Sequence, residues 1–177
     1  MNKLLIAAIA LAMGMAPPVS AQSVGERTGL NALVGVSSST DDFVREAAIG
    51  DMFETVSSEL AAIRGNVPIR AFAARMNEAH QKSSAELTLL VRRHAGGTTI
   101  PPTMDGSRQA MLARLRGLMG DEFNRQYRED QLTAHRDAIS LFQRYAENGD
   151  NPQLRAWARN LLPVLREHLR MAEALGH

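Results

Sequence analysis

Cysteine is absent from the 177 residues of the chain. Its absence excludes disulfide bonds, thiolate metal sites, a cysteine nucleophile and the lipid anchor of a lipoprotein, which needs a cysteine at its cleavage point. Aromatic residues are also few, at five Phe, two Tyr and one Trp. Strands favour aromatic and β-branched side chains, whereas the abundant Ala, Leu and Arg favour helices. Because no segment alternates like a strand either, we predict a single all-α domain.

The chain also lacks an excess of either charge, with 20 Lys and Arg residues against 19 Asp and Glu residues. Lys3 belongs to the leader described next, and 20 minus this one leaves 19 residues of each sign. A neutral chain has no general electrostatic reason to bind nucleic acid or an anionic membrane. Glycine-rich phosphate loops, nucleophile elbows and His-Glu-x-x-His zinc motifs are missing too, so the sequence favours no known enzyme class.

The one long apolar run of the sequence lies within residues 1–21. Lys3 provides a positive start, residues 4–16 form an apolar core, and a proline pair and small residues follow. The core of 13 residues is too short to cross a bilayer, which needs about 20. We therefore expect a signal peptide cleaved after Ala21, a periplasmic location and no transmembrane segment in the mature chain.

The mature chain divides into a short arm and a helical region. Residues 22–39 are rich in Gly and Ser and have no sustained period, which predicts a flexible N-terminal arm. Residues 40–177 contain apolar positions spaced three and four apart, which is typical of the seam of a helical bundle. Four long helices are expected over about 41–64, 68–94, 121–148 and 152–175.

A long connection, residues 95–120, separates the second and third of these helices. Pro101 and Pro102 prevent a regular helix near its start, whereas residues 107–118 have the apolar pattern of a short extra helix. Such a connection either crosses the length of the bundle, as in ferritin-like folds, or joins neighbouring ends. The sequence leaves these two topologies open.

Three histidines occupy predicted inward positions on three different long helices. At a rise of about 1.5 Å per residue, His80, His135 and His168 fall near one central layer in either topology. Glu54, on the first helix, lies at a similar height. Neutral imidazoles with a carboxylate suit zinc, iron or copper, so the metal hypothesis names Glu54, His80, His135 and His168. The alternative is that each histidine is an ordinary core residue that donates to a backbone carbonyl or a nearby side chain.

Glu54 is not on the stripe of the first helix that is expected to face the core, namely Ile49, Met52, Phe53, Val56, Leu60 and Ile63. It belongs to a second stripe of small residues about 140° away, which faces either a neighbouring helix or solvent. A dinuclear iron centre of the bundle type needs two Glu-x-x-His pairs. No carboxylate lies three residues before any helical histidine. The expected cofactor is therefore unknown, with a single transition metal ion as the candidate and no dinuclear iron motif.

Four segments of the sequence resemble one bacterial family. They read FVREAAIGDMFETVSSELA, IRAFAARMNEAHQKSSAEL, HRDAISLF and LLPVLREHLRMAEAL. Together they make residues 43–175 similar to the domain-of-unknown-function family 4142, of the ferritin-like superfamily. The resemblance implies a commonly exported, ferritin-like bundle with no established activity, which agrees with the four helices and the long helix 2–3 connection expected from the sequence. It also implies that the four candidate ligands occupy recurrent polar positions, whereas Ala79 and Asn124 replace carboxylates that the family often has.

Three hypotheses about function follow. The leading one is an exported, non-enzymatic helical bundle with a role in envelope stress or metal handling, where the stress role rests on family analogy alone. The second is a metal-binding or redox bundle with the histidine-rich core site. The third is a protein-interaction module, in which the 22–39 arm and the 95–120 connection contact an envelope protein or a second copy. The sequence names no partner.

Overall fold

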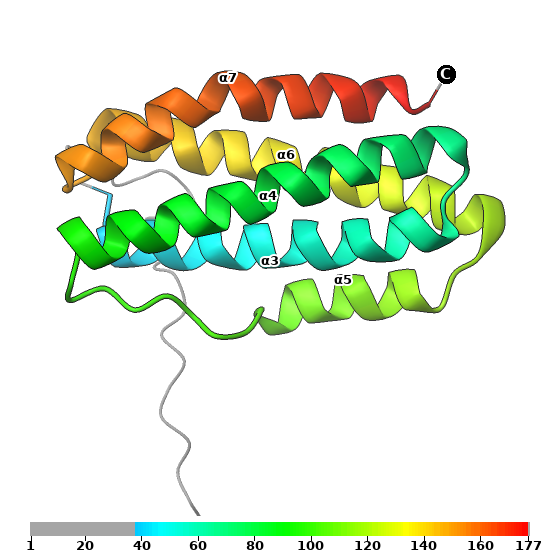
Figure 1. Cartoon of the computed structure of the whole chain (residues 1–177), viewed down its shortest axis with the longest axis horizontal. Helices are drawn as coiled ribbons and strands as arrows, with labels where there is room; N and C mark the ends of the chain where they lie inside the picture. The colour runs from blue at the N-terminus through cyan, green and yellow to red at the C-terminus, as the bar shows by residue number, and fades with distance from the viewer. Residues whose placement is uncertain (1–37, 177) are drawn as a thin grey trace, which may run out of the picture.

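The computed structural model describes residues 38–176, and within that range it contains five helices and no β-strand (Figure 1). The helices are α3 (Thr40–Arg64), α4 (Val67–His94), α5 (Gly106–Arg116), α6 (Gly120–Asn148) and α7 (Pro152–Ala174). The all-α prediction is confirmed. The signal peptide predicted at 1–21, and the predicted 22–39 arm up to residue 37, lie outside the described residues.

The four long helices form an antiparallel bundle with α5 on its outside. In Figure 1, α3 and α7 run from left to right, and α4 and α6 run back. Each long helix contacts two antiparallel neighbours, in the cyclic order α3, α4, α7, α6. α4 ends at one end of the bundle and α6 begins at the other, so residues 95–119 cross its whole length. The crossing topology, typical of ferritin-like folds, is therefore the one adopted.

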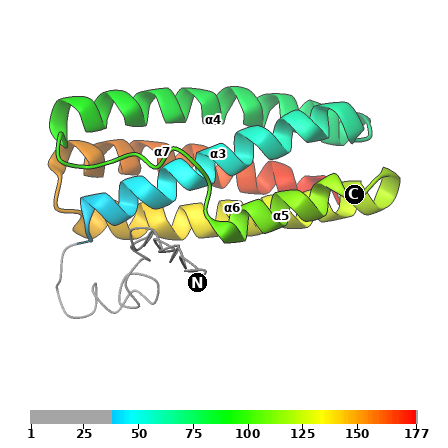
Figure 2. The same ribbon diagram turned by 90° about the horizontal axis from the view of Figure 1, so that it is seen from below.

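The short helix within this connection is part of the fold. α5 lies along α3 and α6 (Figure 2) and packs against both. Asp105 caps its N-terminus by accepting a hydrogen bond from the Arg108 amide at 2.8 Å. Leu112 and Leu115 are buried beneath it. The apolar face that predicted this helix is thus covered by the bundle itself.

Polar side chains cap the starts of two of the long helices. Asn66 and Asn151 are the N-caps of α4 and α7, and a proline follows in the first turn of each helix. At the start of the described chain, the Ser38 amide donates to the carbonyl oxygen of Asn148, 2.9 Å away. The Asp150 amide in turn donates to the Ser38 carbonyl at 3.3 Å. The chain therefore enters α3 tied to the turn between α6 and α7.

The apolar core has two separate parts, one in each half of the bundle. The part at the α6–α7 turn includes Phe43, Phe142 and Trp157, whose aromatic rings contact one another. The part at the other end includes Phe72 and Tyr127, which pack edge to face. His80, His135 and His168 belong to neither part. A polar layer therefore lies between two apolar halves.

The inward face predicted for the first helix is wrong in part. Ile63 is 80% exposed, and Met52 is only partly buried. The small-residue stripe is buried instead, with Ala47, Ser58 and Ala61 all in the interior. Small side chains let helices approach closely, and α3 touches three other helices, so more than one of its faces is covered. None of the described helices is apolar enough over a sufficient length to span a membrane.

Candidate metal centre

Three imidazole rings meet at mid-height in the bundle. α4 contributes His80, α6 contributes His135 and α7 contributes His168, and all three are buried. Their ring centroids are 5.5 to 5.8 Å apart. One ring nitrogen from each residue lies within 4.8 Å of the other two. The structure therefore brings together the three histidines that helix heights place in one layer.

Hydrogen bonds hold two of the rings in fixed orientations. His80 Nδ1 lies 2.7 Å from Asp51 Oδ1, and the Ser84 hydroxyl donates to the other oxygen of Asp51. His135 Nδ1 donates to the backbone carbonyl of Gln131 at 2.9 Å. Histidines that bind metals characteristically donate one ring N–H to a carboxylate or a backbone carbonyl in this way, which orients the other nitrogen.

Three of the four remaining ring nitrogens are buried without a hydrogen-bond partner among the described residues. They are Nε2 of His80, Nε2 of His135 and Nδ1 of His168, and each is buried. Buried polar atoms are nearly always hydrogen-bonded, because leaving one unpaired costs about 1–3 kcal/mol. His80 and His135 each bond to a carboxylate or a backbone carbonyl, as expected for ordinary core histidines, but three further buried nitrogens of the adjacent rings are left without such a partner.

Glu54 faces the same layer from α3. Its side chain is nearly inaccessible, with 3% of the residue exposed, and neither carboxylate oxygen has a hydrogen-bond partner in residues 38–176. Oε1 lies 3.9 Å from Nδ1 of His135. Of the two orientations left open by the sequence, the structure shows the inward one. A buried carboxylate without a partner is strongly unfavourable unless a cation compensates it.

Burial keeps two of the imidazoles neutral. It lowers the pKa of His168 to about 3, helped by the neighbouring His135 and His80. Burial also lowers the pKa of His135, although the charge of Glu54 opposes this. Both side chains are thus in the neutral form that binds metal ions at neutral pH.

His80 behaves differently because of its carboxylate partner. Burial alone lowers its pKa, but the hydrogen bond to Asp51 and the charges of Glu54 and Asp51 outweigh burial, and the pKa is raised overall. Two buried carboxylates, Asp51 and Glu54, thus lie beside three imidazoles, and acidic groups gathered in a buried layer favour a cation.

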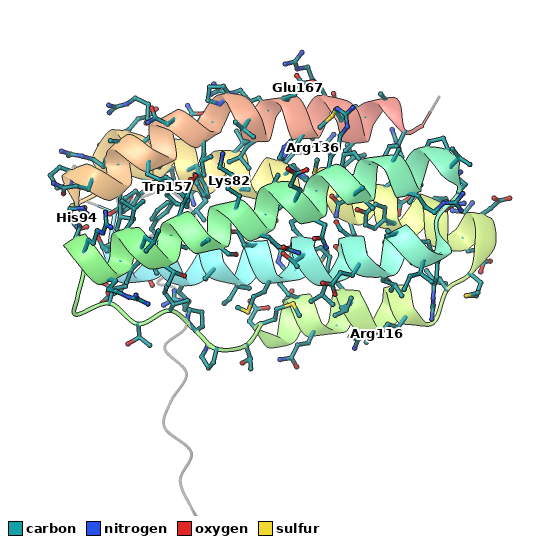
Figure 3. The ribbon with its side chains drawn as sticks, viewed as in Figure 1. Lys82, His94, Arg116, Arg136, Trp157 and Glu167 are labelled. Atoms are coloured by element: carbon teal, nitrogen blue, oxygen red, sulfur yellow. The ribbon has the colours of Figure 1, made fainter. Side chains whose placement is uncertain are left out.

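A cavity of about 340 Å³ adjoins the histidines. It is bounded by all four long helices and by Arg108 of α5. Ala79 and Gly50 are among its lining residues, and a Cβ atom added to Gly50 would meet no atom within 4 Å. The layer is consequently not a tightly filled core. Glu167, next to His168 in sequence, points out from α7 instead (Figure 3).

Asp51 is the site residue that the sequence analysis misses. It is buried and pairs with His80 across the α3–α4 interface. The missed signal is the spacing of Ala47, Asp51, Glu54, Ser58 and Ala61, which alternates four and three like the seams of the other helices. Ala79 stands where the family often has a carboxylate next to His80. Asp51 places a carboxylate beside this histidine instead. Asn124, the other departure from the family pattern, accepts a bond from the Asn66 amide at the bundle end, away from the layer.

Comparison with known proteins gives a family and a fold. The model of the family described as "Domain of unknown function (DUF4142)" matches residues 26–175. No curated protein matches the sequence. A solved structure, "CopM in the Cu(II)-bound form", is similar with a TM-score of 0.65, over 78% of this chain and 96% of that chain. At 11% identity the likeness shows a shared fold and no more.

Proposed function

Because the chain belongs to the DUF4142 family, whose description assigns no activity, we propose a function from the site itself. The bundle binds one transition metal ion through His80, His135 and His168, with Glu54 as a carboxylate ligand. The observation that carries this proposal is the set of three buried, unpartnered ring nitrogens next to a buried, unpartnered carboxylate. Each of these costs free energy in the metal-free chain, and one bound cation would compensate all of them.

The distances in the layer are compatible with such an ion. Three nitrogens that bind one ion at about 2.1 Å lie about 3.4–3.6 Å from one another. The ring nitrogens here lie within 4.8 Å of one another, so binding requires them to close by about 1 Å. Side-chain rotation and a slight approach of the helices provide a movement of that size. Asp51 and the Gln131 carbonyl would hold two of the rings during it.

Copper(II) is the ion that we expect to bind most tightly. Imidazole ligands suit copper and zinc, and divalent affinity generally rises to a maximum at copper. The absence of cysteine removes the thiolates that would favour softer ions. A protein of similar fold, CopM, is known in a Cu(II)-bound form, so this arrangement of helices is compatible with the ion. The role that follows is metal handling, as distinct from catalysis.

Elemental analysis of protein purified without added metal tests the proposal. We expect one copper or zinc ion per chain, and loss of that metal in the double variant His80→Ala/His168→Ala. His94→Ala is the matched control, since His94 is exposed at the end of the same helix as His80 (Figure 3). Far-ultraviolet circular dichroism verifies that each variant remains helical. Substoichiometric metal in the unaltered protein, even after incubation with Cu(II) and Zn(II), would end the proposal.

We propose that the protein acts in the periplasm. The support is the leader pattern of residues 1–21, with its positive start, short apolar core and small residues before position 22. Expression in a bacterium, fractionation and N-terminal sequencing test it. The expected mature protein begins at Gln22 and appears in the periplasmic fraction, whereas an uncleaved chain in the cytoplasm would refute export. The envelope-stress role and the interaction module remain predictions from the sequence.

A further inference from the structure

The cavity beside the histidines is larger than a metal ion requires. Its volume of about 340 Å³ is within the range of small-molecule sites, about 300–1,000 Å³. Its lining includes all three histidines and Glu54, so a molecule inside it would touch the proposed metal site. On the basis of the proposed function, we infer that the cavity admits a small organic anion as a second, exogenous ligand of the bound metal.

The wall of the cavity indicates the chemistry of this ligand. Beyond the polar layer, its buried lining is apolar and consists of Ala47, Ala134, Phe142 and Leu165. An apolar wall favours a ligand with a hydrocarbon body. With Glu54 as its one charged ligand, a divalent cation keeps a positive charge within its ligand set, because Asp51 contacts it only through His80, and this favours an anionic donor group. A small monocarboxylate combines both properties.

The partly exposed side of the cavity, between α3 and α6, carries a cation for such an anion. Arg144 lines the cavity there, donates one hydrogen bond to the Ser140 hydroxyl, and forms no ion pair within the described part of the chain. Arg108 lines the same side, with its guanidinium over the Phe53 ring and 3.6 Å from Asp137. Glu46 and Asp137 line the cavity as well, but they pair with Arg45 and Arg108. Arg144 is therefore the lining arginine without an ion pair among the described residues, and it would attract a carboxylate from solvent.

Gly50 is a glycine that neither backbone conformation nor close packing requires, and it enlarges the cavity. It lies inside α3, where glycine destabilises a helix relative to alanine. Close packing does not require it, because an added Cβ would meet nothing within 4 Å. It does not adopt a left-handed backbone either, since Gly120 is the glycine with positive φ in the described chain. What Gly50 contributes is open volume in the wall of the cavity.

The test uses the full mature protein loaded with Cu(II), with sodium azide and sodium benzoate as probes. Bound azide adds a near-ultraviolet charge-transfer band, and bound benzoate shifts the visible Cu(II) band. We expect both to saturate with the unaltered protein. Gly50→Leu should weaken benzoate binding about tenfold or more by filling the cavity, and affect azide less. Arg144→Gln should weaken both severalfold.

Ala62→Leu is the matched control, because position 62 is exposed on the same helix and should leave both affinities unchanged. Copper stoichiometry and helical circular dichroism establish that each variant still folds, and Gly50→Ala provides a milder change with an intermediate effect. Copper bound without any saturable response to either probe would overturn this inference alone. Equal benzoate affinity in Gly50→Leu and Ala62→Leu would do the same. Failure to bind copper at all would overturn the proposed function, and this inference with it.

Discussion

The Glu54→Gln variant tests whether Glu54 serves metal binding or the stability of the fold. The substitution preserves the shape of the side chain and removes its charge. Burying an uncompensated carboxylate costs several kcal/mol, and an unpaired amide in its place still costs about 1–3 kcal/mol. Loss of the attraction between Glu54 and His80, which helps to raise the pKa of His80, offsets part of the gain. The metal-free variant should therefore be more stable than the unaltered protein by about 1–3 kcal/mol.

Saturating metal should cancel this advantage. Losing a charged ligand lowers metal affinity, by about 10–100-fold if the effect resembles that of removing a supporting carboxylate. A ligand that binds only the folded state stabilises it by about 2.7 kcal/mol at one hundred times its dissociation constant. Weakening that constant 10–100-fold removes about 1.3–2.3 kcal/mol of this stabilisation. The difference in unfolding free energy between the variant and the unaltered protein should thus narrow or reverse when copper is added.

Urea unfolding, followed by circular dichroism with and without Cu(II), measures both effects. Glu59→Gln is the matched control, since Glu59 is exposed on the same helix and forms no hydrogen bond or ion pair with residues 38–176. In thermal unfolding, the gain should appear as a rise of about 3–10 °C in the melting temperature of the metal-free variant. A metal-free Glu54→Gln protein that is clearly less stable than the parent would mean that the carboxylate has a stabilising partner. The reasoning for a cation site would then lose its main support.

Three other perturbations have defined outcomes. The metal-free protein should lose stability as the pH falls from 6.5 towards 3, because the unfolded chain binds a proton at His168 that the folded chain, with the pKa of that residue lowered to about 3, does not. Urea unfolding should therefore show that His168→Leu removes about 1–3 kcal/mol of the difference between pH 7.5 and pH 4.5, and an equal pH response in both proteins would contradict this. Gly50→Ala should raise the free energy of unfolding by about 0.5–1 kcal/mol, since the new methyl group meets no clash. A decrease would contradict the open space that the structure shows beside Gly50. Asp51→Asn should weaken copper binding about 10–100-fold in competition with a chromophoric chelator, and an unchanged affinity would mean that Asp51 does not orient His80.

The long helices are predictable because their seams carry a strong period. α4 and α7 have apolar residues spaced three and four apart, and capping residues and prolines mark their ends. The inward face of α3 is not predictable by the same reasoning. Its most apolar stripe ends in an exposed Ile63, while a weakly apolar stripe of small and polar residues is buried. Hydrophobicity along one helix does not report how many neighbours that helix will have.

The candidate site is likewise only partly predictable from the sequence. The heights of His80, His135 and His168 depend only on helix rise, so their common layer is predictable before the topology is known. Asp51 is not, because its role depends on which face of α3 meets α4. The cavity is not either, since it arises from the combined effect of small side chains on several helices. Neither the role of Asp51 nor the cavity can be recognised from the sequence of a single helix.

The crossing connection divides the bundle into two hairpins, α3–α4 and α6–α7, each made of neighbours in sequence. His80 belongs to the first hairpin, whereas His135 and His168 belong to the second. A metal ion held by all three is therefore a cross-link between two units that the chain itself joins only through residues 95–119. Binding would tighten the contact between the hairpins more than the hairpins themselves. Release of the ion would loosen the same contact, so the distance between the two hairpins would depend on the metal content.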